Sequence, residues 1–315
     1  MNHQPTGLPP GWFEGLVSPR TSAKLYYQDG ALCSDKTGER FEISGQVAQL
    51  LVRELQSQSV ADELKAMDLL PVFGVSYFRE EFLSSVAREL YDLICSTANS
   101  SINIMEIGGG DGQFARVFLK FDHARVFIGD ISKKFLELAP IGIHKVCCDA
   151  CFPYYEEEGL DLVMFWVSLH HFSYENQEKA LKVAVRSLKR GGLLVLFEPN
   201  TFFLPRHIVL KTRLKKDVYF DEEEKLLDFS VLKVIVESAG MEEVYTKFIQ
   251  PPYTLSLLKK LKNWRFYFIA VECLYQIDRH IVLPITNFLL APFPNIRNRI
   301  RKYSASYFLS VYRKT

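Results

Sequence analysis

From residue 102 onward, short apolar runs alternate with amphipathic segments along the chain. Near-continuous apolar runs of strand length indicate strands buried on both faces, and the amphipathic segments between them indicate covering helices. The expected strands are 102–107, 124–129, 144–148, 160–167, 193–197 and 305–312. The expected helices are 112–120, 132–138, 175–188 and 231–239. This alternation predicts an α/β domain built on a mostly parallel sheet.

The residues before this domain follow other patterns. Short runs at 24–27, 31–33 and 40–43 are separated by turn residues and predict a small β module at 1–45. Residues 46–100 favour a helical lead-in, with amphipathic stretches at 46–55 and 79–94. The α/β domain then spans 101–315, and the segments 200–229 and 252–303, which break its alternation, are expected to be insertions.

The overall charge is close to neutral, with 38 Lys and Arg against 37 Asp and Glu. This balance argues against a protein that binds nucleic acid through its net charge, so no nucleic-acid partner is expected. The six cysteines are unevenly spaced and do not suggest a disulfide framework, which favours a reducing compartment. Because the first ten residues hold no apolar run typical of a secretory signal, we expect a cytoplasmic protein.

A glycine-rich segment follows the first strand of the α/β domain. Residues 105–112 read Met-Glu-Ile-Gly-Gly-Gly-Asp-Gly and precede an amphipathic stretch. Glycines allow a sharp turn close to a ligand, and the N–H groups at the start of the next helix point towards it. The spacing Glu-x-Gly-x-Gly-x-Gly differs from the dinucleotide-binding fingerprint. It resembles motif I of the class I S-adenosylmethionine-dependent methyltransferases.

Further segments between 102 and 200 resemble the same family, in its order. Asp130 ends the second strand, and residues 168–172 read Ser-Leu-His-His-Phe. Residues 188–192 match the family's Leu-(Lys/Arg)-Pro-Gly-Gly turn, with Arg190 in place of proline, and residues 198–200 read Glu-Pro-Asn. The resemblance implies a Rossmann-like, seven-stranded, mostly parallel sheet and an enzyme whose cofactor is S-adenosylmethionine.

The resemblance also implies which residues bind the cofactor. Asp130 would hold the ribose hydroxyls, Asp149 would contact the adenine amino group, and Glu106 would orient the ammonium end. Asp130 could instead cap the following helix, a role that Ser132 could also take. The implied cofactor-binding set is Glu106, Gly108, Gly110, Gly112, Asp130, Ile131, Asp149, Ala150 and Ser168.

Methyl transfer from a sulfonium is an in-line displacement, so positioning supplies most of the catalysis. A base is needed only when the acceptor is a hydroxyl or a carbon acid. His170 and His171 lie where the acceptor would approach, and Glu198 is a rival base or acceptor contact. The histidines could equally pack against the end of the strand.

The strand endings resemble those of enzymes that act on small molecules. We therefore expect methyl transfer to oxygen or carbon of a small or lipid-linked molecule. Two alternatives stay open: a protein or RNA methyltransferase, and a non-catalytic methyltransferase-like binding protein.

The segment 255–302 holds nine Lys or Arg against two acids, Glu272 and Asp278, interleaved with aromatic and aliphatic residues. No apolar run approaches the ~20 residues that a spanning helix needs. The composition favours a helix at a membrane surface or over an apolar substrate, which would make the protein peripheral to a membrane. An ordinary helical insertion that packs on the sheet edge is the alternative.

Residues 16–45 resemble the small zinc-ribbon segments that precede some methyltransferases, in degenerate form. Residues 18–21 read Ser-Pro-Arg-Thr where such ribbons carry Cys-Pro-x-Cys, and the second cysteine pair retains only Cys33. One thiolate cannot hold a tetrahedral zinc ion, so we expect no metal here. Cys148 and Cys151 have metal-like spacing, but no second pair accompanies them.

Overall fold

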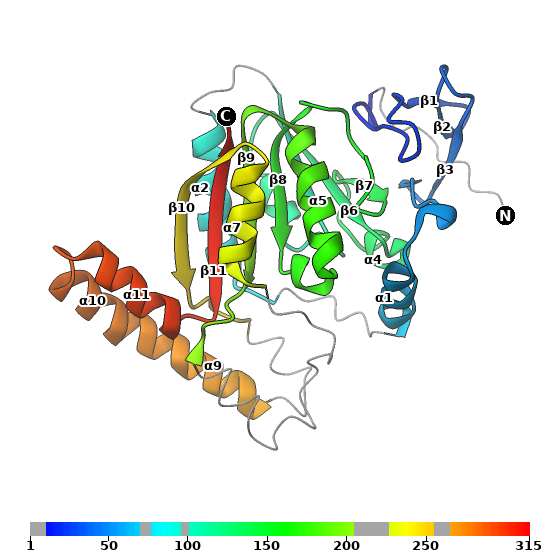
Figure 1. Cartoon of the computed structure of the whole chain (residues 1–315). Coiled ribbons are helices and arrows are strands. Elements are labelled where there is room, and N and C mark those ends of the chain that lie inside the picture. The colour runs from blue at the N-terminus through cyan, green and yellow to red at the C-terminus, as the bar shows by residue number, and fades with distance from the viewer. Residues whose placement is uncertain (1–10, 70–76, 96–100, 205–226, 255–264) are drawn as a thin grey trace.

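The computed structural model describes residues 11–69, 77–95, 101–204, 227–254 and 265–315. Its centre is a twisted sheet with helices on both faces (Figure 1). The strands, in chain order, are β1 (Tyr26–Gln28), β2 (Ala31–Cys33), β3 (Arg40–Ser44), β4 (Val47–Gln49), β5 (Ile102–Ile107), β6 (Ala124–Asp130), β7 (His144–Cys147), β8 (Leu160–Trp166), β9 (Leu188–Pro199), β10 (Met241–Ile249) and β11 (Tyr307–Lys314).

The helices connect these strands. They are α1 (Gln58–Leu69), α2 (Glu80–Cys95), α3 (Ala115–Phe118), α4 (Lys133–Leu136), α5 (Tyr174–Ser187), α7 (Phe229–Ser238), α9 (Arg265–Ile277), α10 (Leu283–Leu289) and α11 (Pro294–Ser304). Short 3₁₀ helices, η1 (Arg53–Leu55) and η2 (Leu169–His171), and one π-helical segment, η5 (Asp278–Val282), complete the described elements.

The sheet confirms the α/β class but corrects the expected strand count. Its order is β1-β2-β3-β4-β7-β6-β5-β8-β9-β11-β10, which gives eleven described strands rather than seven. Five of the ten pairings between the described strands are parallel and five are antiparallel, so the sheet is mixed. The extra strands precede residue 102, and β4 joins them to the parallel part by pairing with β7.

The helix expected over residues 46–55 is wrong. Val47 and Ala48 are fully buried in β4, and the backbone N–H of Leu50 donates to the carbonyl of Cys147 over 2.8 Å. Without β4, the edge of β7 would leave backbone N–H and C=O groups unpaired. Residues 47–49 form hydrogen bonds with these groups and therefore adopt a strand despite their helical spacing. Strand β10 was missed because its half-exposed residues form no continuous apolar run.

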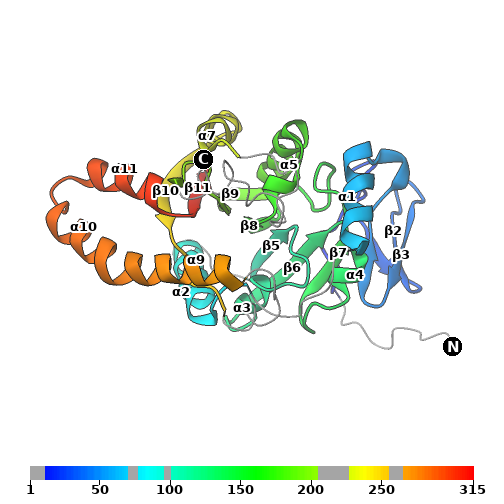
Figure 2. The same ribbon diagram turned by 90° about the horizontal axis from the view of Figure 1, so that it is seen from below.

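Two hydrophobic cores cover the two faces of the sheet. Helices α5 and α7 pack on one face, and α2, α3 and α4 pack on the other (Figure 2). Along β5, Met105 and Ile107 belong to the first core, whereas Ile102 and Ile104 belong to the second. This alternation is the two-residue period of a strand buried on both faces.

The parallel strands bring their carboxyl ends to one edge of the sheet. There, β5 is flanked by β6 and β8, and β9 follows β8. Ligands of open α/β sheets bind outside this edge, near the point where the strand order reverses. The order reverses at β5, whose two neighbours are β6 and β8, so the segments after these strands are the candidates for a site.

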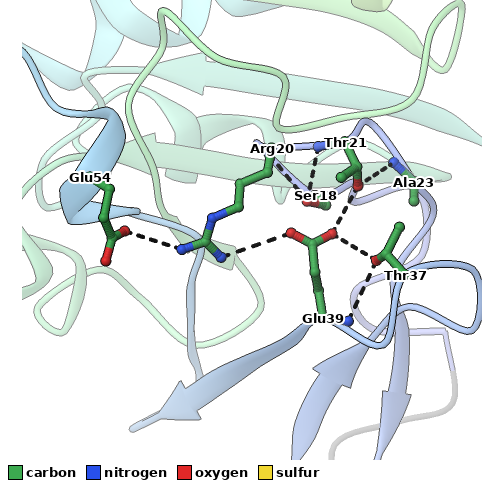
Figure 3. Close-up of polar contacts among 7 residues, drawn as sticks. All are labelled: Ser18, Arg20, Thr21, Ala23, Thr37, Glu39 and Glu54. Atoms are coloured by element: carbon green, nitrogen blue, oxygen red, sulfur yellow. Dashed lines mark hydrogen bonds and ion pairs between the residues drawn. The ribbon is translucent and has the colours of Figure 1, made fainter.

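The N-terminal strands are joined to a polar network that centres on Glu39 (Figure 3). The hydroxyls of Thr21 and Thr37 each donate to Glu39 Oε2 over 2.8 Å, and Ser18 Oγ accepts from the backbone N–H of Arg20 over 3.1 Å. The guanidinium of Arg20 lies 3.8 Å from Glu39 Oε1 and bonds Glu54 over 3.1 Å. The hydroxyls of Ser18, Thr21 and Thr37 thus gather at one carboxylate.

This network shifts the pKa of Glu39. Partial burial acts to raise it, but hydrogen bonds from the hydroxyls of Ser18, Thr21 and Thr37 hold it below its usual value. A lowered folded pKa stabilises the fold above the unfolded pKa, and this contribution is lost as the pH falls through the folded pKa. In the part of the chain that the structure describes, no group of three or more His, Cys, Asp or Glu side chains could hold a metal ion.

We predict that Glu39→Ala lowers the free energy of unfolding by about 1–3 kcal/mol, because it removes the shared acceptor of two hydroxyls. Thermal unfolding at pH 7 with and without EDTA measures this, with Glu157→Ala at an exposed carboxylate as the matched control. EDTA is expected to leave the wild-type midpoint unchanged. A lower midpoint in EDTA would show that the module holds a metal.

Candidate active site

The glycine loop after β5 runs through three left-handed backbone positions. Gly108, Gly110 and Gly112 have φ angles of 67°, 51° and 74°. A Cβ atom on Gly108 would lie 2.5 Å from the Cβ of Ser168, whereas a Cβ on Gly110 would meet no atom within 4 Å. Gly108 therefore lets the loop pack against the segment after β8, and Gly110 borders open space at the edge of the sheet.

Glu106 is buried at the end of β5, with 3% of its surface exposed. Its Oε2 accepts a hydrogen bond from the backbone N–H of Ala115 over 2.7 Å, at the start of α3. Burial, opposed by that amide and assisted by the nearby Asp111 and Asp130, raises the pKa of Glu106 to about 8. The side chain ties the glycine loop to the helix that follows it.

Asp130 ends β6 and holds the same loop from the other side. Its Oδ2 accepts from the backbone N–H of Gly110 over 2.9 Å, and its Oδ1 accepts from that of Ser132 over 2.8 Å. Burial raises the pKa of Asp130, and these amides oppose the rise. The Ser132 side chain makes no cap, so of the two capping candidates only Asp130 bonds the backbone at the start of α4.

The end of β7 lies next to the end of β6. The backbone N–H of Cys148 donates to the carbonyl of Asp130 over 3.0 Å, and the thiol of Cys147 donates to the carbonyl of Ile131 over 3.5 Å. Asp149 is buried and accepts from the backbone N–H of Cys151 over 2.9 Å, with buried Ala150 between them. The predicted residues at the ends of β5, β6 and β7 thus line one continuous edge.

The end of β9 carries a buried carboxylate that organises the turn after β8. Glu198 is fully buried, and its Oε1 accepts from the backbone N–H groups of Ser168 and Leu169 over 3.0 and 2.7 Å. Its Oε2 lies 2.7 Å from Nδ1 of His170. A carboxylate in this position accepts a hydrogen bond from Nδ1–H, which leaves the lone pair of the neutral imidazole on Nε2.

The backbone of this turn is strained. Val167 adopts a φ of 55°, which is an outlier for a β-branched residue and costs on the order of 1–3 kcal/mol. The strain is tolerated because its neighbours are fixed: Val167 N–H donates to the carbonyl of Phe197 over 2.7 Å, and Ser168 Oγ donates to that of Ile107 over 2.8 Å. Ser168 is thereby held against the glycine loop.

His171 occupies a different environment from His170. The two rings lie 4.1 Å apart, but 40% of the His171 side chain is exposed and its Nδ1 lies 3.9 Å from Glu63 of α1. Desolvation by the surrounding protein lowers the pKa of His171, and the neighbouring His170 lowers it further. Of the two histidines, His170 therefore has the close and directional carboxylate partner.

Sequence reasoning missed a second segment at this site. The backbone N–H of Tyr77 donates to Oε1 of Gln113 in the glycine-loop region over 2.9 Å. Phe78 bridges to Tyr253, and Tyr253 OH donates to Tyr307 OH over 3.0 Å. These contacts join the start of α2 to the end of β10 across a long sequence separation, and no local pattern signals them. The one unusual sequence feature in these two segments is the Pro-Pro-Tyr run at 251–253.

The part of the chain that holds this site is similar to a known protein family. Residues 105–196 match the family model described as a methyltransferase domain. The match supports the predicted enzyme class and the predicted cofactor, S-adenosylmethionine. The matched segment runs from β5 into β9 and contains the glycine loop, Asp130, Asp149 and His170.

Comparisons with whole proteins give distant matches. No curated protein matches the chain. A structure of Haemonchus contortus phosphoethanolamine N-methyltransferase 2 with phosphomonomethylethanolamine and S-adenosylhomocysteine is 15% identical, with a TM-score of 0.45 over 73% of this chain and 52% of that one. This chain therefore spans about half the length of that relative.

Two further structures are matched over most or all of their own length. A SAM-dependent methyltransferase from Archaeoglobus fulgidus is 17% identical, with a TM-score of 0.45 over 74% of this chain and 94% of that one. The YcgJ protein of Bacillus subtilis is 14% identical, with a TM-score of 0.44 over 75% of this chain and 100% of that one.

We predict different outcomes for two neighbouring glycines. Gly108→Ala should cost about 1–3 kcal/mol of stability from overpacking against Ser168, in addition to the left-handed backbone cost that both variants share. Gly110→Ala should keep more stability but bind S-adenosylmethionine roughly tenfold or more weakly, since its methyl group enters the open space. Thermal unfolding and calorimetric titration measure the two effects.

The matched control is Gly30→Ala, whose φ is 77° and whose Cβ would also meet nothing within 4 Å. It isolates the backbone cost at a site far from the loop in sequence. Wild-type cofactor affinity in Gly110→Ala would contradict the placement of the cofactor beside this residue.

Proposed function

We propose that the protein transfers a methyl group from S-adenosylmethionine to oxygen or carbon of a small or lipid-linked molecule. In this proposal His170 is the general base and Glu198 is its positioning residue. The observation that carries the proposal is the 2.7 Å contact between His170 Nδ1 and a fully buried Glu198 at the edge of the sheet. A methyl donor site alone would not require such a pair.

The pair suits an acceptor that must lose a proton. S-adenosylmethionine supplies a sulfonium-bound methyl group when it is bound. A hydroxyl or carbon acid becomes the nucleophile as Nε2 of His170 takes its proton, and Glu198 stabilises the imidazolium that forms. Glu198 also accepts hydrogen bonds from two backbone N–H groups, so its orientation does not depend on the methyl acceptor. His171, whose Nδ1 lies 3.9 Å from Glu63 rather than at hydrogen-bond distance from a carboxylate, is assigned to contact with the acceptor.

The residues around the glycine loop fit the cofactor. Open space at Gly110 leaves room for a ligand, and the carboxylates of Glu106 and Asp130 provide acceptors for its cationic and hydroxyl groups. We assign Glu106, Gly108, Gly110, Gly112, Asp130, Ile131, Asp149, Ala150 and Ser168 to the cofactor side of the site. Asp130 has a second role in this assignment, since it already holds the loop through Gly110.

The acceptor side is assigned from the same edge. We place the acceptor next to His170, where the insertions after β9 and β10 begin. Residues 205–226 and 255–264 of these insertions lie outside the described residues. A cytoplasmic enzyme that works at a membrane surface is consistent with a lipid-linked acceptor, and the degenerate zinc-ribbon module is retained as part of the proposal.

We predict that His170→Gln lowers methyl transfer by about 10²- to 10⁴-fold while the Kd for S-adenosylmethionine stays near the wild-type value. Glutamine can still donate to Glu198, so the buried carboxylate keeps a partner. Glu198→Gln should slow transfer comparably, because its amide would donate to Nδ1 and leave the proton on Nε2. Transfer of a labelled methyl group to phenol, hydroquinone and lipid-linked sugar acceptors measures the rates.

The matched control for these variants is His171→Gln, which should change the rate far less than His170→Gln. A wild-type rate in His170→Gln, together with an inactive His171→Gln, would transfer the base assignment to His171. Loss of cofactor binding in both would indicate a structural role instead.

We also predict that cofactor affinity depends on the protonation of Glu106. With a pKa of about 8, Glu106 is mainly protonated at pH 6 and has to lose its proton to pair with the ammonium group. The Kd for S-adenosylmethionine should therefore fall by up to roughly tenfold between pH 6 and pH 7. Calorimetric titration at several pH values tests this. Glu106→Gln should bind more weakly and without that slope, and an unchanged slope would remove Glu106 from the cofactor site.

A further inference from the structure

Helices α9, α10 and α11 form an arm that begins and ends at the active-site edge of the sheet. The arm connects β10 to β11, and Tyr307 at the start of β11 pairs with both Ile249 and Pro199. Pro199 directly follows Glu198, so the root of the arm lies beside the proposed base. Figures 1 and 2 show the arm extending away from the sheet, with the α10–α11 connection at its far end.

The root of the arm is fixed by buried polar contacts. Arg301 of α11 forms a buried ion pair with Asp278, and its Nη2 donates to the carbonyl of Phe248 over 3.1 Å. Asn200 Nδ2 donates to the carbonyls of Lys302 and Ala305, each over 2.7 Å. These contacts hold the arm to the ends of β9 and β10, so its far end has a defined position relative to the site.

The far end of the arm is apolar and exposed. Phe288, Leu289 and Phe293 are 83%, 62% and 54% exposed. Residues 290–293, which connect α10 to α11, read Leu-Ala-Pro-Phe, although surface turns are normally rich in Gly, Asn, Asp and Ser. The turn is nonetheless ordered, since Leu290 N–H donates to the carbonyl of Thr286 over 3.0 Å and Phe293 N–H to that of Leu290 over 2.9 Å. Such a patch is characteristic of an interaction surface.

Positive charge accompanies this apolar end. Residues 279–304 contain five basic residues and no Asp or Glu. Arg301 is paired with Asp278, whereas Arg299 is exposed on α11 and Arg297 is half-buried on the same helix. An apolar surface bordered by arginines complements a bilayer that contains anionic lipids. Lys259, Lys260 and Lys262 of the same basic segment lie outside the described residues.

We propose that the α10–α11 end of the arm docks on an anionic membrane surface, with Phe288, Leu289 and Phe293 entering the acyl–headgroup boundary. Among the helices that the structure describes, none has the length and apolar character to cross a bilayer. A second copy of the chain is the poorer occupant, because pairing two such ends would bring like charges together without an acid to offset them. The inference deepens the proposed function by placing the active-site edge near a lipid-linked acceptor.

The test uses the purified full-length protein and needs no methyl acceptor. Flotation with vesicles of phosphatidylcholine alone, and with added phosphatidylglycerol, should show binding only to the anionic vesicles. The variant Phe288→Ser/Leu289→Ser/Phe293→Ser should lose that binding. Ile141→Ser/Leu138→Ser is the matched control, since these side chains are 88% and 51% exposed elsewhere on the protein and should bind as wild type.

A second pair of variants tests the charge. Arg297→Gln/Arg299→Gln should weaken partition onto anionic vesicles by about 30-fold, from about 1 kcal/mol for each arginine near the surface. Lys36→Gln/Arg190→Gln, at exposed basic residues outside the arm, should change it little. Calorimetric titration with S-adenosylmethionine on each variant confirms that the fold and the cofactor site are intact.

Unchanged flotation in the serine variant, or equal binding to neutral and anionic vesicles, would overturn the proposal. A concentration-dependent dimer that the same serine substitutions dissociate, with no vesicle binding, would assign the surface to self-association instead. Because these readouts require no methyl transfer, vesicle binding can fail while the enzyme remains active on a soluble acceptor. The two proposals can therefore be rejected separately.

Discussion

The carboxylate of Glu198 is fully buried at the end of β9, so both of its oxygens must be satisfied within the protein. Two amides of the turn after β8 and the Nδ1 of His170 satisfy them. The chain reaches this arrangement by placing Val167 in a left-handed conformation. Ser168 then lies so close to the glycine loop that only glycine fits at position 108. The proposed base, the strained turn and the loop therefore all depend on one buried carboxyl group.

Two further carboxylates hold the glycine loop in a shape ready for a ligand. Glu106 binds an amide at the start of α3, and Asp130 binds the amide of Gly110. Both are buried and have raised pKa values, because desolvation disfavours their charge. A cationic ligand would offset that desolvation, so the site is organised by groups whose charge is more favourable when the ligand is bound. This links the stability of the loop to its occupancy.

The arm formed by α9, α10 and α11 is rooted at the same edge of the sheet. Its root contacts Asn200 and Phe248, and its apolar end lies farthest from the sheet. Any surface that binds this end would be held at a fixed orientation to the carboxyl ends of the strands. A transferase that meets its acceptor at a membrane needs such an orientation, since binding energy spent on positioning lowers the barrier to transfer.

The sequence by itself determined the parallel strands from β5 to β9, the glycine loop, and the choice of Asp130, Glu198 and His170 as candidate site residues, because these features follow from local periodicity and motif spacing. Tertiary structure decided the rest. Strand β4 formed where a helical pattern met the open edge of β7, and β10 formed through its partner β11. The roles proposed for His170 and Glu198 differ only because of their 2.7 Å contact across 28 residues. Edge pairing and buried hydrogen bonds join residues that are far apart in the chain. Local sequence patterns cannot predict such partners, because they depend only on neighbouring residues.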